Sequence, residues 1–166
     1  MYRTTEDFLN NWKHERIATL KNFKLLTDSS LQQKITPEGR SLGFLAWHIV
    51  TGLGEMGRQC GLLIPAPAKN SQAPVKASEI LSAYDTASAA VASEVKSKWT
   101  DAMLLDEIPM YGQKWTRGGT LLSLITHQAH HRGQMSVLMR QAGIPVHGVY
   151  GPAKEEWSII GMQAPE

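Results

Sequence analysis

The chain has 166 residues, of which 42% are hydrophobic and 19% are charged. This length fits one domain spanning residues 1–166, and the hydrophobic fraction is enough for a buried core, which excludes a disordered chain. Seventeen Lys and Arg against fifteen Asp and Glu leave a formal charge of +2, so a nucleic-acid partner held by a large basic field is not expected. The single cysteine, Cys60, excludes an intramolecular disulfide and a cysteine-rich zinc site.

The sequence also argues against export and membrane insertion. Glu6 and Asp7 lie where a secretory signal would need an apolar run. The longest stretches without Asp, Glu, Lys or Arg are residues 41–54 and 118–131, both shorter than the roughly 20 residues of a spanning helix. We therefore expect a soluble, cytoplasmic protein with no membrane partner.

Four long segments are predicted to be helices because their apolar residues recur at helical spacing. In chain order they run from Thr5 to Leu26, from Ser41 to before Pro65, from Ser78 to Trp99 and from Arg117 to Ala142. Ser41 is a natural N-cap, and Gly143 and Pro145 stop the last helix. Arg16 lies in the middle of the apolar stripe of the first helix, an unusual place for a charge.

The segments between the predicted helices are less regular. Residues 65–74 are predicted to form a connecting loop, and residues 108–115 an extended segment or an irregular hairpin that contains Pro109. The tail from Val146 is predicted to hold one short helix around residues 155–160. Little strand signal remains, so the sequence predicts an all-α, antiparallel four-helix bundle. We expect its core to include Trp12, Phe23, Phe44, Leu45, Trp47, Ile80, Val91, Leu124, Leu138 and Tyr84, the last with its hydroxyl at the rim.

Three of the six histidines cluster near the middle of the last helix. His127 and His131 are four residues apart, so both rings project from one face, about 40° apart, and can share a metal ion. His130 lies about 100° from His131 and is not expected to join them. Such a pair also fits histidines that only pack at a helix surface. Here, however, the surrounding segment is uncharged, and buried neutral imidazoles need polar partners, which a metal ion supplies.

A third ligand must come from another helix, and His48 is the candidate. It interrupts residues 42–50, the most apolar segment of the chain, where a histidine with a hydrogen-bond partner in the core is the alternative. Three imidazoles leave a coordination position open, as in catalytic metal sites. Ligation by nitrogen alone suits zinc, nickel, copper or iron, and the expected cofactor is one divalent transition metal ion, zinc or nickel.

The sequence leaves more than one role possible for three further polar residues. Glu55 projects within about 20° of His48, so it either orients a ligand, accepts a proton, binds the metal or lies at the wet end of its helix. Arg16 and Gln134 either bind an anionic substrate group or lie at the bundle edge. No basic cluster is evident, because the arginines are scattered over different elements: Arg16, Arg58, Arg117 and Arg132.

Two short motifs and their spacing resemble those of the DinB-like (DinB/YfiT) family of small bacterial metalloproteins. The motifs are Leu45–Ile49 in the second predicted helix and Thr126–Met135 in the fourth, followed by a similar ending, Leu138–Pro145 and Tyr150–Pro152. The resemblance spans nearly the whole chain. It implies a four-helix bundle with an up-down-down-up order, a metal held by His48, His127 and His131, and a homodimer.

The resemblance implies a metal more directly than a reaction. Related bundles include transferases and isomerases that use a low-molecular-weight thiol, so a metal-dependent thiol S-transferase with a small-molecule substrate is the first hypothesis. The alternatives are a metal-dependent hydrolase and a non-catalytic metal-binding module of a stress response. No catalytic residue is assigned from the sequence.

Overall fold

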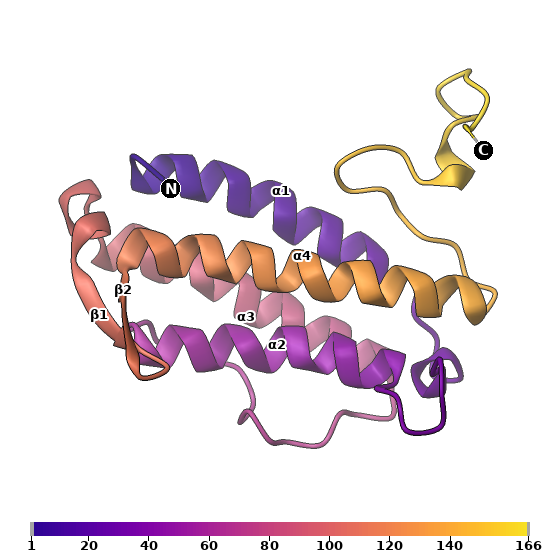
Figure 1. The fold of residues 1–166 in the computed structure, drawn as a ribbon, viewed down its shortest axis with the longest axis horizontal. Helices are drawn as coiled ribbons and strands as arrows, with labels where there is room; N and C mark the ends of the chain where they lie inside the picture. The colour runs from indigo at the N-terminus through magenta and orange to yellow at the C-terminus, as the bar shows by residue number, and fades with distance from the viewer. Residues whose placement is uncertain (1, 166) are drawn as a thin grey trace.

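Four long helices make up most of the computed structural model, which describes residues 2–165 (Figure 1). The helices are α1 (Thr5–Phe23), α2 (Leu42–Gln59), α3 (Ala77–Lys98) and α4 (Arg117–Gln141). Helix α2 packs against α3 and α4, and α1 packs against the same two helices. The expected all-α four-helix bundle is therefore confirmed. Within the described range, no helix combines the length and apolar character needed to cross a membrane.

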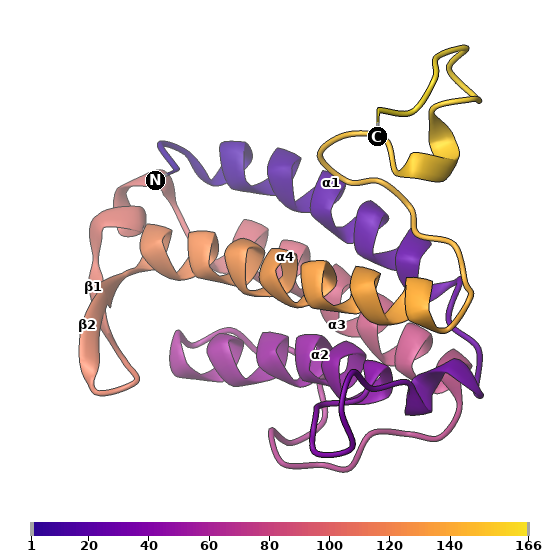
Figure 2. The same cartoon turned by 45° about the vertical axis from the view of Figure 1, so that its right-hand side comes forward.

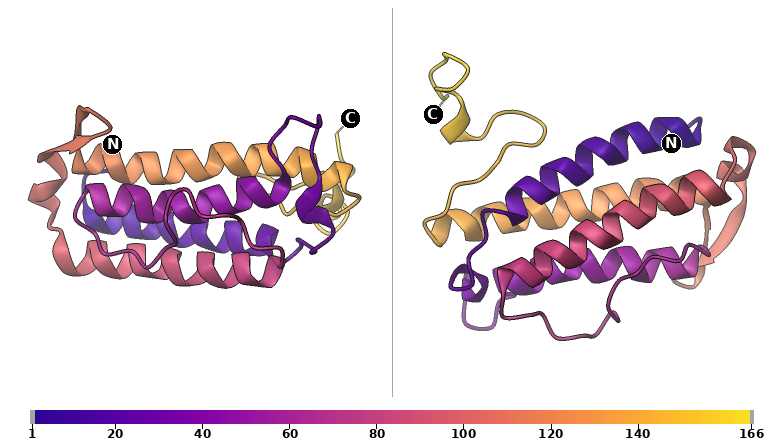
Figure 3. Two further views of the ribbon diagram at one scale, coloured as in Figure 1. Left: turned by 90° about the horizontal axis from the view of Figure 1, so that it is seen from below. Right: turned by 180° about the vertical axis from the view of Figure 1, so that it is seen from behind.

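The helices follow the up-down-down-up order. Helices α1 and α4 run in one direction and α2 and α3 in the other, as the views from the front, from below and from behind show (Figures 1 and 3). Because α2 and α3 run parallel, the chain must return along the bundle between them. Residues 60–76 make this return as a largely extended segment that lies beside α2, and we call it the crossover.

Side-chain caps explain where the helices begin. The side chains of Thr4, Ser41 and Thr116 each accept a hydrogen bond from a backbone N–H in the first turn of α1, α2 and α4. Helix α1 ends earlier than predicted, at Phe23 rather than Leu26, and α2 ends at Gln59, before Pro65 as predicted. Gly61, with φ 81°, takes the left-handed conformation that terminates α2, and the backbone N–H of Leu62 donates back to the Gly57 carbonyl.

A β-hairpin forms in the predicted extended region. Strands β1 (Glu107–Met110) and β2 (Gln113–Thr116) pair antiparallel, joined through Tyr111 and Gly112, both with positive φ. The C-terminal segment leaves the end of α4 and extends away from the helices toward its tip (Figure 2), although Tyr150 and Glu155 still contact the bundle. Up to residue 165 it contains only a short 3-10 helix, Lys154–Glu156, in place of the predicted helix at 155–160.

The predicted core is correct except at Phe44 and the Tyr84 hydroxyl. Phe44 is 42% exposed because its ring stacks on the outer side of α2, between Arg40 and His48. Tyr84 is fully buried, and its hydroxyl donates to Gln128 Oε1 at 2.8 Å inside the bundle rather than at the rim. The other predicted core residues are buried: Trp12, Phe23, Leu45, Trp47, Ile80, Val91, Leu124 and Leu138.

A buried ion pair joins α1 to α4. Arg132 Nη2 donates to Glu15 Oε2 at 2.6 Å, and the two side chains are 5% and 1% exposed. Arg132 Nη1 donates to Thr19 Oγ1 at 2.7 Å, and the Tyr150 hydroxyl donates to Glu15 Oε1 at 2.6 Å. Gln128 Nε2 donates to Glu15 Oε2 at 3.4 Å. These contacts satisfy both charges, as a buried ion pair requires.

The charge that lies inside the bundle is thus Glu15 and not Arg16. The Arg16 side chain instead reaches α3, where Nε donates to Ser88 Oγ at 3.1 Å and the guanidinium pairs with Asp85. Successive helix positions differ by about 100°, which is enough to place one neighbour in the core and the other at its edge.

Removing one partner of the buried pair should strongly destabilise the bundle. We expect Arg132→Met to lower the free energy of unfolding by about 3–5 kcal/mol, because Glu15 is left buried without a cation. Arg140→Met is the matched control, since Arg140 pairs with Glu155 at the surface, and it should cost less than about 1 kcal/mol. Urea unfolding measures both, and equal losses would contradict a special role for the buried pair.

Candidate metal centre

His48 from α2 and His127 and His131 from α4 meet where these two helices pack together. One ring nitrogen from each histidine lies within 4.8 Å of the corresponding nitrogens of the other two. His131 is buried, and His48 and His127 are half-buried. The structure therefore brings together the three histidines that the sequence predicts, and we call them the triad.

The ring nitrogens have the arrangement that a metal ion needs. The Nε2 atoms of His48 and His127 are 3.2 Å apart, close to the edge of about 3.3 Å of a tetrahedron with zinc–nitrogen bonds of about 2.0–2.1 Å. His131 Nδ1 lies 2.7 Å from Gln134 Oε1, an acceptor, so Nδ1 carries the proton and Nε2 keeps a free lone pair. The donor set thus fits a divalent transition metal.

Burial keeps the triad in the neutral form that binds metals. Burial is the largest cause that lowers the pKa of each of the three histidines, and together with the neighbouring imidazoles it lowers the pKa of His127 to about 4. The neighbouring His131 imidazole and the Arg40 guanidinium lower the pKa of His48 further. The lowered pKa values disfavour the imidazolium form, which cannot bind a metal ion through its protonated nitrogens.

A glycine on α2 makes room for one ligand. A Cβ at Gly52 would lie 2.9 Å from His127 Cε1, closer than carbon atoms can pack. Glycine inside a helix lowers the stability of the protein by up to about 1 kcal/mol relative to alanine. A glycine at position 52 of α2 therefore indicates that a side chain from another helix packs closely against the backbone there. Sequence analysis missed this residue.

The structure also gives a place to each of the other candidate residues. His130 is exposed, and it is not a member of the triad. Gln134 orients His131, whereas Arg16 is held against α3. Glu55 pairs with Lys69, with Oε1 and Nζ 2.5 Å apart. Among residues 2–165, no carboxylate is hydrogen-bonded to a triad ring.

Sequence analysis missed the residues that anchor the two ligands of α4. Gln128 directly follows His127, and Arg132 directly follows His131, and both are buried against Glu15. A ligand and its following residue therefore point to different sides of α4, one toward α2 and one toward α1. The sequence signal that could have indicated these anchoring residues was Glu15, a charged residue on the buried side of α1 that needs a buried partner.

Fold and site together define a four-helix bundle with a three-histidine cluster that could hold a metal ion. The chain belongs to the DinB family, whose sequence profile matches residues 1–164. It is 45% identical to the uncharacterized protein YrdA of Bacillus subtilis (strain 168), over 100% of this chain and 99% of that protein.

Two solved structures show the same architecture. A DinB-like protein from Bacillus cereus ATCC 10987 is 41% identical, with a TM-score of 0.87 over 90% of this chain and all of that one. The DinB-like protein YjoA of Bacillus subtilis is 19% identical, with a TM-score of 0.66 over 87% of this chain and 99% of that one. This second likeness concerns the fold alone.

Metal binding should depend on the triad and not on its neighbour. We expect His127→Ala and His131→Ala to abolish stoichiometric zinc or nickel binding while most helix content remains, because each removes a ligand. His130→Ala is the control and should keep full stoichiometry. Elemental analysis of dialysed protein, with circular dichroism, measures both effects. Full occupancy in His48→Ala, or equal loss in His130→Ala, would show that the ligand assignment is wrong.

Proposed function

We propose that this protein binds one divalent transition metal ion, zinc or nickel, through His48, His127 and His131. The observation that carries the proposal is the approach of three neutral ring nitrogens within 4.8 Å of one another. Three protein ligands leave a position for an exogenous group, which is the pattern of catalytic rather than structural sites.

We further propose that the protein transfers a low-molecular-weight thiol to a small electrophile. A bound divalent cation supplies Lewis acidity, which keeps a coordinating thiol deprotonated at neutral pH. A thiol has an ordinary pKa of about 8.5, so it needs no protein base in addition. This matches the surroundings of the triad, where Gln134 is a neutral amide and Glu55 is neutralised by Lys69.

The residues of this chain would then have distinct tasks. The triad holds its ligand nitrogens in place, and Gln134 fixes the tautomer of His131. The sulfur of the thiolate forms a bond to the electrophilic carbon, and the leaving group departs with the electron pair of the bond that breaks. The thiol proton passes to solvent. Hydrolysis, the alternative, would transfer an oxygen in place of the sulfur.

A cobalt-substituted protein tests the thiol step. We expect a low-molecular-weight thiol to add an intense near-ultraviolet sulfur-to-cobalt band and to shift the visible bands, because a sulfur ligand enters the open position. The matched alcohol, with oxygen in place of sulfur, should leave the spectrum unchanged. The same spectrum with and without thiol would favour the hydrolase or the non-catalytic metal-binding module.

We also propose that the protein forms a homodimer. The resemblance stated above implies it, and the C-terminal segment exposes Ile159, Ile160 and Met162, each more than half exposed. Apolar side chains gathered on one exposed segment commonly mark an interface.

Sedimentation should therefore report twice the mass of 18.4 kDa. Ile159→Glu should shift the protein toward the monomer, because a charge in an apolar interface opposes association. Leu63→Glu is the control, at an exposed leucine of the crossover, and should leave the dimer intact. A monomer at high protein concentration would contradict the proposal.

A further inference from the structure

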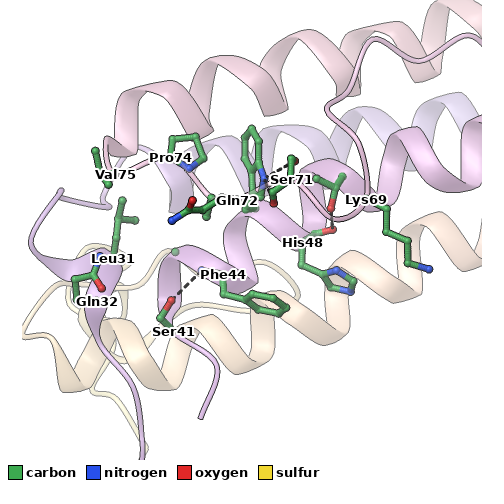
Figure 4. Close-up of a pocket in the computed structure, with 14 residues that line it drawn as sticks. Leu31, Gln32, Ser41, Phe44, His48, Lys69, Ser71, Gln72, Pro74 and Val75 are labelled. Atoms are coloured by element: carbon green, nitrogen blue, oxygen red, sulfur yellow. Dashed lines mark hydrogen bonds between the residues drawn. The ribbon is translucent and has the colours of Figure 1, made fainter. Parts of the chain in front are cut away.

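A groove of about 380 Å³ runs along α2 and includes His48 in its lining (Figure 4). One wall belongs to α2, and the other is formed by residues 69–75 of the crossover. Phe44, Trp47 and Pro74 give the groove an apolar surface, and Lys69 lines it near His48. Its volume is that of a site for a small organic molecule.

Polar contacts hold the crossover in place without filling the groove. The Trp47 indole N–H donates to the Ser71 carbonyl at 3.1 Å and lies 3.0 Å from its hydroxyl. Lys69 pairs with Glu55, and its Nζ lies 5.8 Å from the centre of the Tyr111 ring. Both walls are thus fixed before any ligand arrives, and a preformed site loses less entropy on binding.

Phe44 is the exposed aromatic residue of this site. Its ring lies nearly parallel to the His48 ring, at 5.9 Å between centroids and 13° between planes. The Arg40 guanidinium lies 5.0 Å from the centre of the Phe44 ring. Phe44 and His48 are four positions apart and so lie on one side of α2, and Arg40 directly precedes the N-cap Ser41 of this helix. The Phe44 ring is therefore close to both a cation and a residue of the triad.

Positively charged side chains outnumber negatively charged ones around the groove. Lys69 lines it and no carboxylate does, whereas Arg40 lies outside the lining with its guanidinium next to the ring of Phe44. Glu55 offsets the charge of Lys69, but within residues 2–165 Arg40 makes no ion pair or hydrogen bond through its guanidinium. An uncompensated positive charge at the edge of an apolar groove favours an anion over a cation.

We propose that this groove binds an organic anion with an apolar ring, with the ring against Phe44 and Trp47 and the negative group toward Arg40 and Lys69. In the thiol transfer proposed above, such an anion would be the electrophile, and this role rests on the proposed function. Binding of the anion to the groove does not depend on a metal ion or on the reaction.

Two naphthalene compounds of opposite charge test the proposal by calorimetry. The full-length protein is kept metal-free at pH 7.5, so that a carboxylate cannot bind a metal ion. We expect 1-naphthoate to bind with one-to-one stoichiometry and 1-naphthylmethylammonium to bind more weakly. Arg40→Gln and Lys69→Gln should each reduce this preference by about two- to fivefold, the range for exposed charge pairs.

Substitutions in the groove locate the binding. Phe44→Ala removes an exposed ring and should weaken naphthoate about tenfold without unfolding the protein. Ala73→Trp fills the groove and should abolish binding, whereas Ala102→Trp adds the same side chain at an exposed position on the 3-10 helix after α3 and should have no effect. Thermal unfolding shows whether the variants are folded.

The outcomes separate this inference from the proposed function. No naphthoate binding below about 1 mM, equal affinity for both compounds, or unchanged binding in Phe44→Ala would overturn the inference, even if zinc still binds the triad. Naphthoate binding with loss in Ala73→Trp supports it, even if zinc titration of the same protein fails and the metal proposal falls.

Discussion

The buried pair of Glu15 and Arg132 constrains how α4 can pack. Both side chains are almost fully buried, and a buried charge is tolerated only with its partner at hydrogen-bond distance. A rotation or an axial shift of α4 by one residue would separate the two groups and leave both unpaired. The ion pair and the accompanying contacts of Gln128 therefore select one register of α4 against α1. That register also fixes the direction of His127 and His131, because each directly precedes one of the anchoring residues.

Helix α4 thus has two polar sides with different properties. On the α1 side, Arg132 and Gln128 are buried and hydrogen-bonded to fixed partners. On the α2 side, the triad consists of neutral imidazoles, and among residues 2–165 only His131 has a hydrogen-bond partner outside the triad, Gln134, for its second nitrogen. The hydrogen bonds on the α1 side hold the helix that carries His127 and His131, which is the kind of support that precise ligand geometry requires.

Local sequence information predicts the helices and the triad because both depend on spacing within single helices. His127 and His131 are four residues apart, and His48 stands out because it interrupts an apolar segment. The partners of Glu15 and Glu55 could not be predicted in this way. Glu15 pairs with a residue of another helix, and Glu55 with Lys69 of an irregular connection. The exposure of Phe44 was missed for a related reason, since helical periodicity assigns a face and cannot tell what covers it.

The order of the helices relates the fold to the chemistry. Because α2 and α3 run parallel, the chain must cross back along the bundle, and this crossover forms the second wall of the groove. An antiparallel connection could have been a short turn, and α2 would then have kept that side open to solvent. His48 contributes to the triad and also lines the groove, so it is the residue shared by the two parts of the site. A ligand held in the groove would accordingly lie beside His48, one of the three residues of the triad, and that proximity is a direct consequence of the bundle topology.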